Sequence, residues 1–135
     1  MKREIKFRAY SSHNHKMYPV SDIEWDIDGR IWVTADDGKN GIELIDEEAH
    51  LMQYTGLNDK NGREIYEGDI IVTHPKSKYE APNSGVVQYG GSRPMFGYKT
   101  EDGEEYEIWS SNAYRTYEVI GNIFENPELR EAQHE

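Results

Sequence analysis

Apolar and polar residues alternate with a period of two along much of the chain. Between residues 22 and 28, Ile23, Trp25 and Ile27 occupy one set of alternate positions and acidic residues occupy the other set. In a β-strand this period places the two sets on opposite faces. Similar short runs, many with β-branched or aromatic residues, recur as far as residue 124. The pattern predicts a mainly β chain.

Glycine-containing dipeptides separate these runs. Asp28-Gly29, Asn61-Gly62 and Asp102-Gly103 predict hairpin turns, and we expect Asn61-Gly62 to form a type I′ turn, in which both residues have positive φ. Gly68 and Gly121 each lie between two short β runs, which predicts a bulge or sharp corner. The residues expected to have structural roles at turns and corners are Asp59, Asn61, Gly62, Gly68, Asp69 and Gly121.

The same signals suggest how the chain is organised. We expect an N-terminal β lobe over residues 1–50, a second β unit over residues 51–125 and a tail over residues 126–135. The charged segment 46–50, which could form one helical turn, is expected to connect the first two. Asn126, Pro127 and Glu128 supply a capping residue, a proline for the first helical position and an acid for the first turn, so the tail should begin with a short helix.

Three sequence blocks together resemble the YopX family of phage and prophage proteins. They are REIKFRAY at residues 3–10, LMQYTGLNDKNGREIYEGDIIV at residues 51–72 and VIGNIFENPEL at residues 119–129. The resemblance implies that residues 51–125 form a small SH3-like β-barrel. It brings no assigned biochemical role and no catalytic or ligand-binding residue.

Composition narrows the classes of function. The 135 residues are enough for one domain or two small lobes. The absence of cysteine excludes disulfides, thiolate nucleophiles and cysteine-based metal centres, and it suits a cytoplasmic protein. The N-terminal residues are charged and lack an apolar segment, and no stretch approaches the ~20 apolar residues that cross a bilayer, so we expect neither export nor membrane insertion.

Charge is unevenly distributed around a net value of −11. Residues 21–50 and 101–135 each contain ten acidic and two basic residues. Binding of duplex DNA over a broad surface requires a concentrated positive field, which this chain lacks.

Candidate chemical sites are weak. His13 and His15 have a spacing that could present both rings to a metal ion, but the sequence specifies no third ligand. Residues 36–41 match a calcium-binding loop only loosely. Carboxylate pairs such as Glu67 with Asp69, or Glu105 with Glu107, are expected by composition in so acidic a chain. We therefore expect no catalytic site, no metal and no cofactor.

Three classes of function remain. The favoured one is a non-enzymatic module of phage origin that binds a protein or associates with itself through exposed aromatic residues and the long loop over residues 76–85. One alternative is a barrel that binds single-stranded nucleic acid through stacked rings and lysine or arginine side chains. Another is an acidic inhibitor that imitates DNA with residues 22–28 and 101–107. The candidate partner-binding residues are Lys76, Lys78, Tyr79, Tyr89, Arg93, Tyr98 and Trp109.

Overall fold

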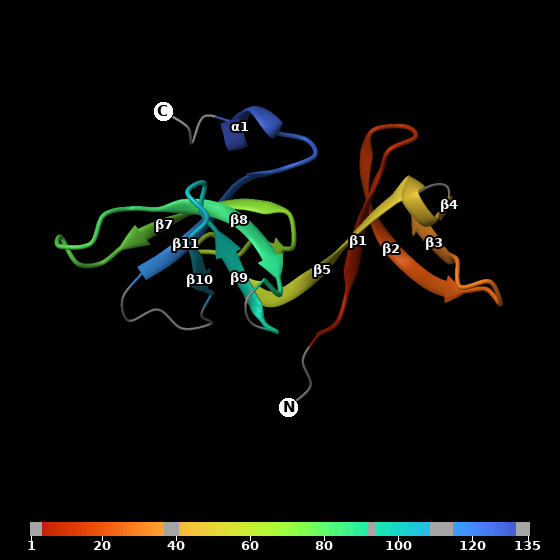
Figure 1. Ribbon diagram of the computed structural model, residues 1–135, viewed down its shortest axis with the longest axis horizontal. Coiled ribbons are helices and arrows are strands. Elements are labelled where there is room, and N and C mark those ends of the chain that lie inside the picture. The colour runs from red at the N-terminus through yellow and green to blue at the C-terminus, as the bar shows by residue number, and fades with distance from the viewer. Residues whose placement is uncertain (1–3, 37–40, 92–93, 109–114, 132–135) are drawn as a thin grey trace. The chain divides into compact units, whose positions relative to one another are not determined.

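The computed structural model describes residues 4–36, 41–91, 94–108 and 115–131 (Figure 1). Contacts divide the chain into two units, Met1–Tyr54 and Thr55–Glu135, which we call unit 1 and unit 2. The division falls within one strand, β5 (Ala49–Asn58), which pairs with β1 in unit 1 and with β6 in unit 2. No helix in the described parts of the chain is long and apolar enough to cross a membrane.

Unit 1 is an antiparallel sheet in the order β4-β3-β2-β1-β5. Its further elements are β1 (Phe7–Ser11), β2 (Lys16–Trp25), β3 (Ile31–Asp36), β4 (Gly41–Ile45) and the short 3₁₀ helix η1 (Asp46–Glu48). The core contains one residue or more from most of these strands: Ala9, Tyr18, Val33, Ala35 and Leu44. The 3₁₀ helix η1 supplies the helical turn that was expected in the charged segment 46–50.

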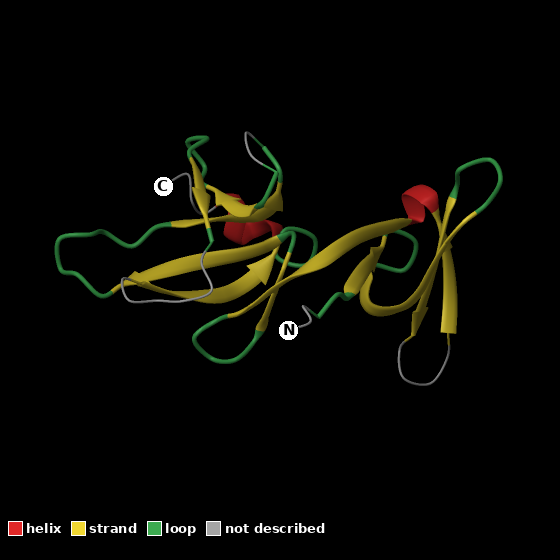
Figure 2. Ribbon diagram, turned by 90° about the horizontal axis from the view of Figure 1, so that it is seen from below, coloured by secondary structure: helices red, strands yellow, loops and turns green. Residues whose placement is uncertain are grey.

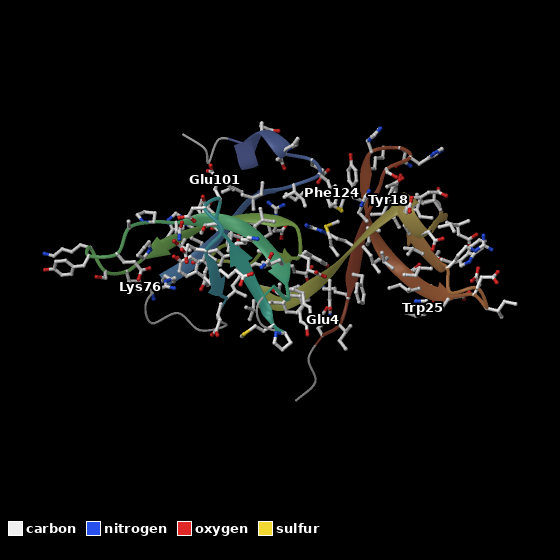
Figure 3. All side chains as sticks on the ribbon, in the orientation of Figure 1. Glu4, Tyr18, Trp25, Lys76, Glu101 and Phe124 are labelled. Atoms are coloured by element: carbon white, nitrogen blue, oxygen red, sulfur yellow. The ribbon has the colours of Figure 1, made fainter. Side chains whose placement is uncertain are left out.

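The strand expected over residues 22–28 is shorter than its alternation suggested. β2 ends at Trp25, and the turn begins at Asp26. Trp25, labelled in Figure 3, is 67% exposed. Ile27 is fully exposed. The expectation that Ile23, Trp25 and Ile27 share one face of a single strand is wrong for Ile27, because it belongs to the turn.

Unit 2 contains a five-stranded antiparallel sheet in the order β10-β9-β8-β7-β11. Figure 2 shows the strands in yellow. Its elements are β6 (Glu64–Tyr66), β7 (Asp69–Pro75), β8 (Ser84–Tyr89), β9 (Phe96–Lys99), β10 (Glu105–Glu107), β11 (Arg115–Asn122) and the short helix α1 (Pro127–Glu131). Ile65 of β6 and Leu57 of β5 pack against one face of this sheet. The core cluster comprises Ile65, Ile71, Val87, Tyr98, Ile108, Tyr117 and Val119.

The prediction of a mainly β chain with a short C-terminal helix is confirmed. The strands form two antiparallel sheets. In the described residues no ladder joins β10 to β11, so the sheet of unit 2 does not close into a barrel. Its apolar face is instead covered by side chains from β5 and β6.

Two hairpin turns share one sequence pattern and one geometry. In Asp26–Arg30 and Asp59–Arg63, the glycine N–H donates to the carbonyl of the first aspartate at 3.0 Å, and that aspartate's N–H donates to the arginine carbonyl. Gly29 and Gly62 have φ values of 82° and 83°. Asn61 is not left-handed, so the expected type I′ turn is wrong. The structure has a three-residue loop that ends in a left-handed glycine.

Candidate functional site

The long loop between β7 and β8 carries three of the candidate partner-binding residues, Lys76, Lys78 and Tyr79. Lys76 is labelled in Figure 3. The Tyr79 side chain is 88% exposed, and the Lys78 Nζ atom lies 5.4 Å from the centroid of its ring. The end of the loop is anchored, because the N–H of Asn83 donates to Thr73 Oγ1 at 2.8 Å and the Thr73 N–H donates to the Asn83 carbonyl at 2.8 Å. The loop thus exposes the Tyr79 ring, and its C-terminal end is held to β7 by hydrogen bonds.

The remaining candidate residues are separated by the fold. Tyr89 lies at the end of β8, is 54% exposed and makes an edge-to-face contact with Phe96 at 5.0 Å. Tyr98 is only 2% exposed, so the expectation that it is a surface contact residue is wrong. It lies opposite Val87 in the middle of the β8–β9 ladder, within the core. Arg93 and Trp109 lie outside the described residues.

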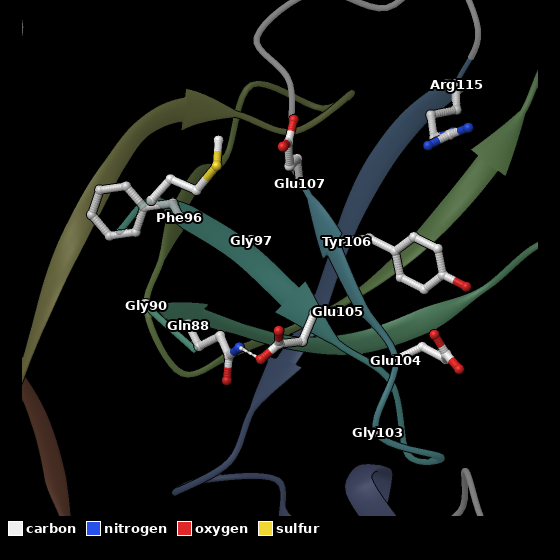
Figure 4. Close-up of a pocket in the computed structure, with 11 residues that line it drawn as sticks. Gln88, Gly90, Phe96, Gly97, Gly103, Glu104, Glu105, Tyr106, Glu107 and Arg115 are labelled. Atoms are coloured by element: carbon white, nitrogen blue, oxygen red, sulfur yellow. Dashed lines mark hydrogen bonds between the residues drawn. The ribbon is translucent and has the colours of Figure 1, made fainter. Parts of the chain in front are cut away.

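An open groove of about 610 Å³ crosses the β8–β9–β10 end of unit 2 (Figure 4). Gly97 of β9 lies at its centre, with the side chains of Gln88, Glu105, Glu107 and Phe96 around it. Because Gly97 has no side chain, the sheet backbone forms the floor. A Cβ atom there would lie 2.4 Å from the carbonyl oxygen of Tyr106, so β9 and β10 approach closely at this point. The groove lining is Gln88, Gly90, Met95, Phe96, Gly97, Gly103, Glu104, Glu105, Tyr106, Glu107 and Arg115.

Acidic side chains dominate the charge of the groove. Glu104, Glu105 and Glu107 line it, and the amide Nε2 of Gln88 donates to Glu105 Oε1 at 3.3 Å. Arg115 also lines the groove, but its guanidinium donates to Glu80 Oε1 at 2.9 Å. This hydrogen bond raises the pKa of Arg115, although burial opposes the shift. Among the described residues that line the groove, acidic side chains therefore outnumber basic ones.

A row of tyrosine rings leads from the groove into the core. Tyr106, 41% exposed, stacks on Tyr98 with a centroid separation of 5.3 Å and an interplanar angle of 20°. Tyr98 in turn meets the buried ring of Tyr117 edge to face at 6.2 Å. Burial, with a further contribution from Tyr117, raises the pKa of Tyr98 to about 12. The stack fixes the position of the Tyr106 ring at the surface.

Unit 1 has an acidic surface, but it is not the continuous row that the sequence suggested. A hydrogen bond and the charge of Asp22 raise the pKa of Glu24. Asp26 lies in the turn after β2 and does not extend this acidic face. Its carboxylate accepts hydrogen bonds from Trp32 Nε1 at 3.0 Å and from Arg30 Nε at 2.9 Å. The hydrogen bond from Trp32 is the main reason that the pKa of Asp26 falls to about 2.

No group of histidine, aspartate and glutamate side chains in the described residues is arranged to hold a metal ion. His13 and His15 lie in the turn between β1 and β2, where the Tyr10 hydroxyl is 3.4 Å from His15 Nδ1. Of the carboxylates with turn and corner roles, Asp69 is fully buried and accepts a hydrogen bond from the N–H of Tyr66 at 2.8 Å. The structure places Gly68 at that corner with φ of 85° and Gly121 at a bulge in the β7–β11 ladder.

A protein-family model described as YopX protein matches residues 6–131. The chain belongs to the YopX family. Protein EF1440 from Enterococcus faecalis has a similar solved structure, with 30% sequence identity, a TM-score of 0.64 and coverage of 96% of this chain and 99% of that one. Protein yopX from Bacillus subtilis is similar in fold, with 20% identity, a TM-score of 0.60 and coverage of 92% and 96%. No curated protein matches the chain.

Sequence reasoning missed the groove of this YopX-family chain. Gly97 was not distinguished from other glycines, because its position opposite Glu107 depends on the β9–β10 register. The repeated turn was also missed, although its signal is local: Asp26–Arg30 and Asp59–Arg63 both read Asp, any residue, Asp or Asn, Gly, Arg. An aspartate two residues before such a dipeptide indicates a side chain that caps the turn.

Proposed function

We propose that this YopX-family chain is a non-enzymatic interaction module that binds another protein through unit 2. The observation that supports this is the exposure of two aromatic rings in unit 2. Tyr106, which lines the groove, is 41% exposed, and Tyr89, which contacts the groove residue Phe96, is 54% exposed. Exposed tyrosines anchor protein interfaces because they bury a large area at a small cost in side-chain entropy. The stack of Tyr106 on Tyr98 lowers that cost further, since the ring is already ordered.

The resemblance of the sequence to phage and prophage proteins supports a phage origin and a role in the cytoplasm of the host cell. The partner is then a host or phage protein.

Binding of single-stranded nucleic acid has less support. It requires a positively charged groove beside exposed rings. The groove beside Tyr106 is lined by Glu104, Glu105 and Glu107, whereas Lys76 and Lys78 lie on the β7–β8 loop. A phosphate backbone in the groove would be repelled.

The test is affinity capture from host lysate with the full chain, in parallel with and without nuclease. We expect a protein whose recovery survives nuclease and falls at least about tenfold with Tyr106→Ser or Tyr89→Ser. Ile27→Ser, which removes a fully exposed side chain from unit 1, is the matched control and should leave recovery unchanged. Recovery that is insensitive to both ring substitutions, or that disappears with nuclease, would contradict the proposal. Sedimentation velocity of the same variants tests self-association.

A further inference from the structure

We propose that the groove binds an extended, positively charged segment of a partner protein, aligned along β10 with lysine or arginine at alternate positions. This inference rests on the proposed function and specifies the partner's chemistry.

β10 offers an edge for such a segment. It ends the strand order of the five-stranded sheet in the part of the chain that the structure describes, and a strand at the end of a sheet can pair its backbone with another extended chain. Glu105 and Glu107 are two residues apart on β10 and therefore share one face. An added strand would place its own alternate residues opposite them, and opposite charges in such cross-strand positions stabilise the pairing.

The groove has room for long side chains on this face. Its volume is about 610 Å³, and Gly97, opposite Glu107 in the β9–β10 register, leaves the floor free of side-chain atoms. The hydrogen bond from Gln88 orients the Glu105 carboxylate at the edge of this hollow. A lysine or arginine of the added strand could thus extend across β10 towards β9.

Tyr106 favours apolar residues in the partner segment at the positions between its basic residues. It lies between Glu105 and Glu107 and so points to the other face of β10, where it stacks on Tyr98. Intervening residues of the partner would contact the exposed part of this ring. The preferred segment therefore alternates basic and apolar residues.

Charge favours a foreign segment over a second copy of this chain. Of the described residues that line the groove, Glu104, Glu105 and Glu107 are acidic and Arg115 is basic, and Arg115 donates to Glu80. Lys99 lies opposite Glu105 on β9. The net charge of −11 attracts a basic partner and repels another copy. The chain's own alternating pair, Lys6 and Arg8, is already flanked: the Lys6 carbonyl accepts a hydrogen bond from Tyr54, and Arg8 pairs with strands on both sides.

The probes are three blocked heptapeptides added to the full chain at low salt. The first, acetyl-Thr-Arg-Val-Arg-Val-Arg-Thr-amide, has the proposed pattern. The second replaces each arginine with citrulline, which keeps the shape and removes the charge. The third has the same composition with the three arginines adjacent. We expect the first to shift the amide NMR signals of Gly97, Glu105 and Glu107 and to bind at least about tenfold more tightly than either of the others.

Two substitutions locate the site. Glu107→Gln and Glu105→Gln should each weaken binding of the alternating peptide by about three- to tenfold. Glu101→Gln removes the same charge from the same hairpin outside the groove and should have no comparable effect. Glu105 also accepts a hydrogen bond from Gln88, so Glu105→Gln could disturb the fold. In that event the effect of Glu107→Gln on peptide binding is the test of the site.

Equal binding of the alternating and adjacent-arginine peptides would overturn the proposal, as would signal changes centred on Asp22 and Glu24. Both results would indicate general attraction to an acidic chain. Capture of a partner that depends on Tyr106 but not on Glu107, with no peptide bound in the groove, would leave the interaction module standing and reject the cationic occupant. Peptide binding in the groove without any captured partner would support the cationic site and contradict the proposed function.

Discussion

The carboxylate of Asp59 accepts a hydrogen bond of 2.9 Å from the backbone N–H of Val119, 60 residues further along the chain. Its other oxygen accepts hydrogen bonds of 2.9 Å from the N–H groups of Asn61 and Arg63. The N–H of Lys60 donates to the Tyr117 carbonyl at 2.8 Å. One nearly buried side chain therefore closes the β5–β6 turn and attaches it to β11, the last strand of unit 2.

We expect Asp59→Ala to destabilise unit 2 by about 3 kcal/mol, because three backbone donors lose a charged acceptor. Asp59→Asn should also destabilise, since one side of the amide would present a donor to these N–H groups. Urea unfolding followed by circular dichroism measures the change. Asp28→Ala, an exposed aspartate in the related turn, is the control and should change stability by less than about 0.5 kcal/mol. Equal losses for Asp59→Ala and Asp28→Ala would show that the three hydrogen bonds of Asp59 contribute nothing to stability.

The related turn of unit 1 should titrate at unusually low pH. The hydrogen bond from Trp32, followed by that from the Arg30 N–H, lowers the pKa of Asp26 from 3.8 to about 2. A carboxyl whose pKa is lower in the folded chain favours folding above its ordinary pKa, and this contribution is lost as the pH falls through about 2. The indole N–H signal of Trp32 should report the titration directly, with a midpoint near 2. A midpoint near 3.8 would contradict the hydrogen-bonded geometry, and Asp26→Asn should abolish the transition.

The fold could be predicted where the signals were local. Alternation with a period of two indicated the strands, and Gly29, Gly62 and Gly103 indicated the reversals, because each property depends on a few neighbouring residues. The contact from Asp59 to Val119 could not be predicted, since it depends on how distant strands align. The short range of these signals also explains why this strand was expected to continue to residue 28, although β2 ends at Trp25.

The site was predicted poorly for the same reason. Tyr89 and Tyr98 are both tyrosines in short apolar runs, yet one is at the surface and the other in the core. The β8–β9 register decides between them: Tyr98 lies opposite Val87 in the core, and Tyr89 lies opposite Phe96 at the end of the ladder. The groove at Gly97 likewise exists only because β10 places Glu107 opposite it.

Replacing a buried and an exposed tyrosine by alanine should have very different effects on the free energy of unfolding. We expect Tyr98→Ala to cost about 3–5 kcal/mol, because it leaves a cavity between Tyr106 and Tyr117. Tyr79→Ala, at 88% exposure, should change stability by less than about 0.5 kcal/mol. Urea unfolding of both variants provides the comparison, and similar values for the two would contradict the placement of Tyr98. Tyr98→Phe should retain most of the stability, because the stacked rings remain.

Gly121 should be intolerant of a side chain although its backbone is not left-handed. A Cβ atom at this position would lie 2.7 Å from Asn126 Oδ1 and 2.8 Å from Leu129 Cδ1, both of which belong to the segment around the start of α1. Because Asn126 Oδ1 also accepts a hydrogen bond from the Asn122 N–H, the added methyl group should displace this cap. We expect Gly121→Ala to destabilise by about 1–3 kcal/mol and to accelerate hydrogen exchange of the Asn122 and Leu129 amides.

Gly41→Ala is the matched control for that substitution. Gly41 is also a strand residue without positive φ, and among the described residues a Cβ atom there would meet the Ala35 carbonyl oxygen at 3.8 Å, an ordinary contact. We expect its effect on stability to remain within about 0.5 kcal/mol. If Gly121→Ala proved equally mild and left exchange of the Leu129 amide unchanged, the close approach of this segment to the β11 bulge would be wrong. A large effect confined to Gly121 would show that the glycine is required by packing and not by backbone conformation.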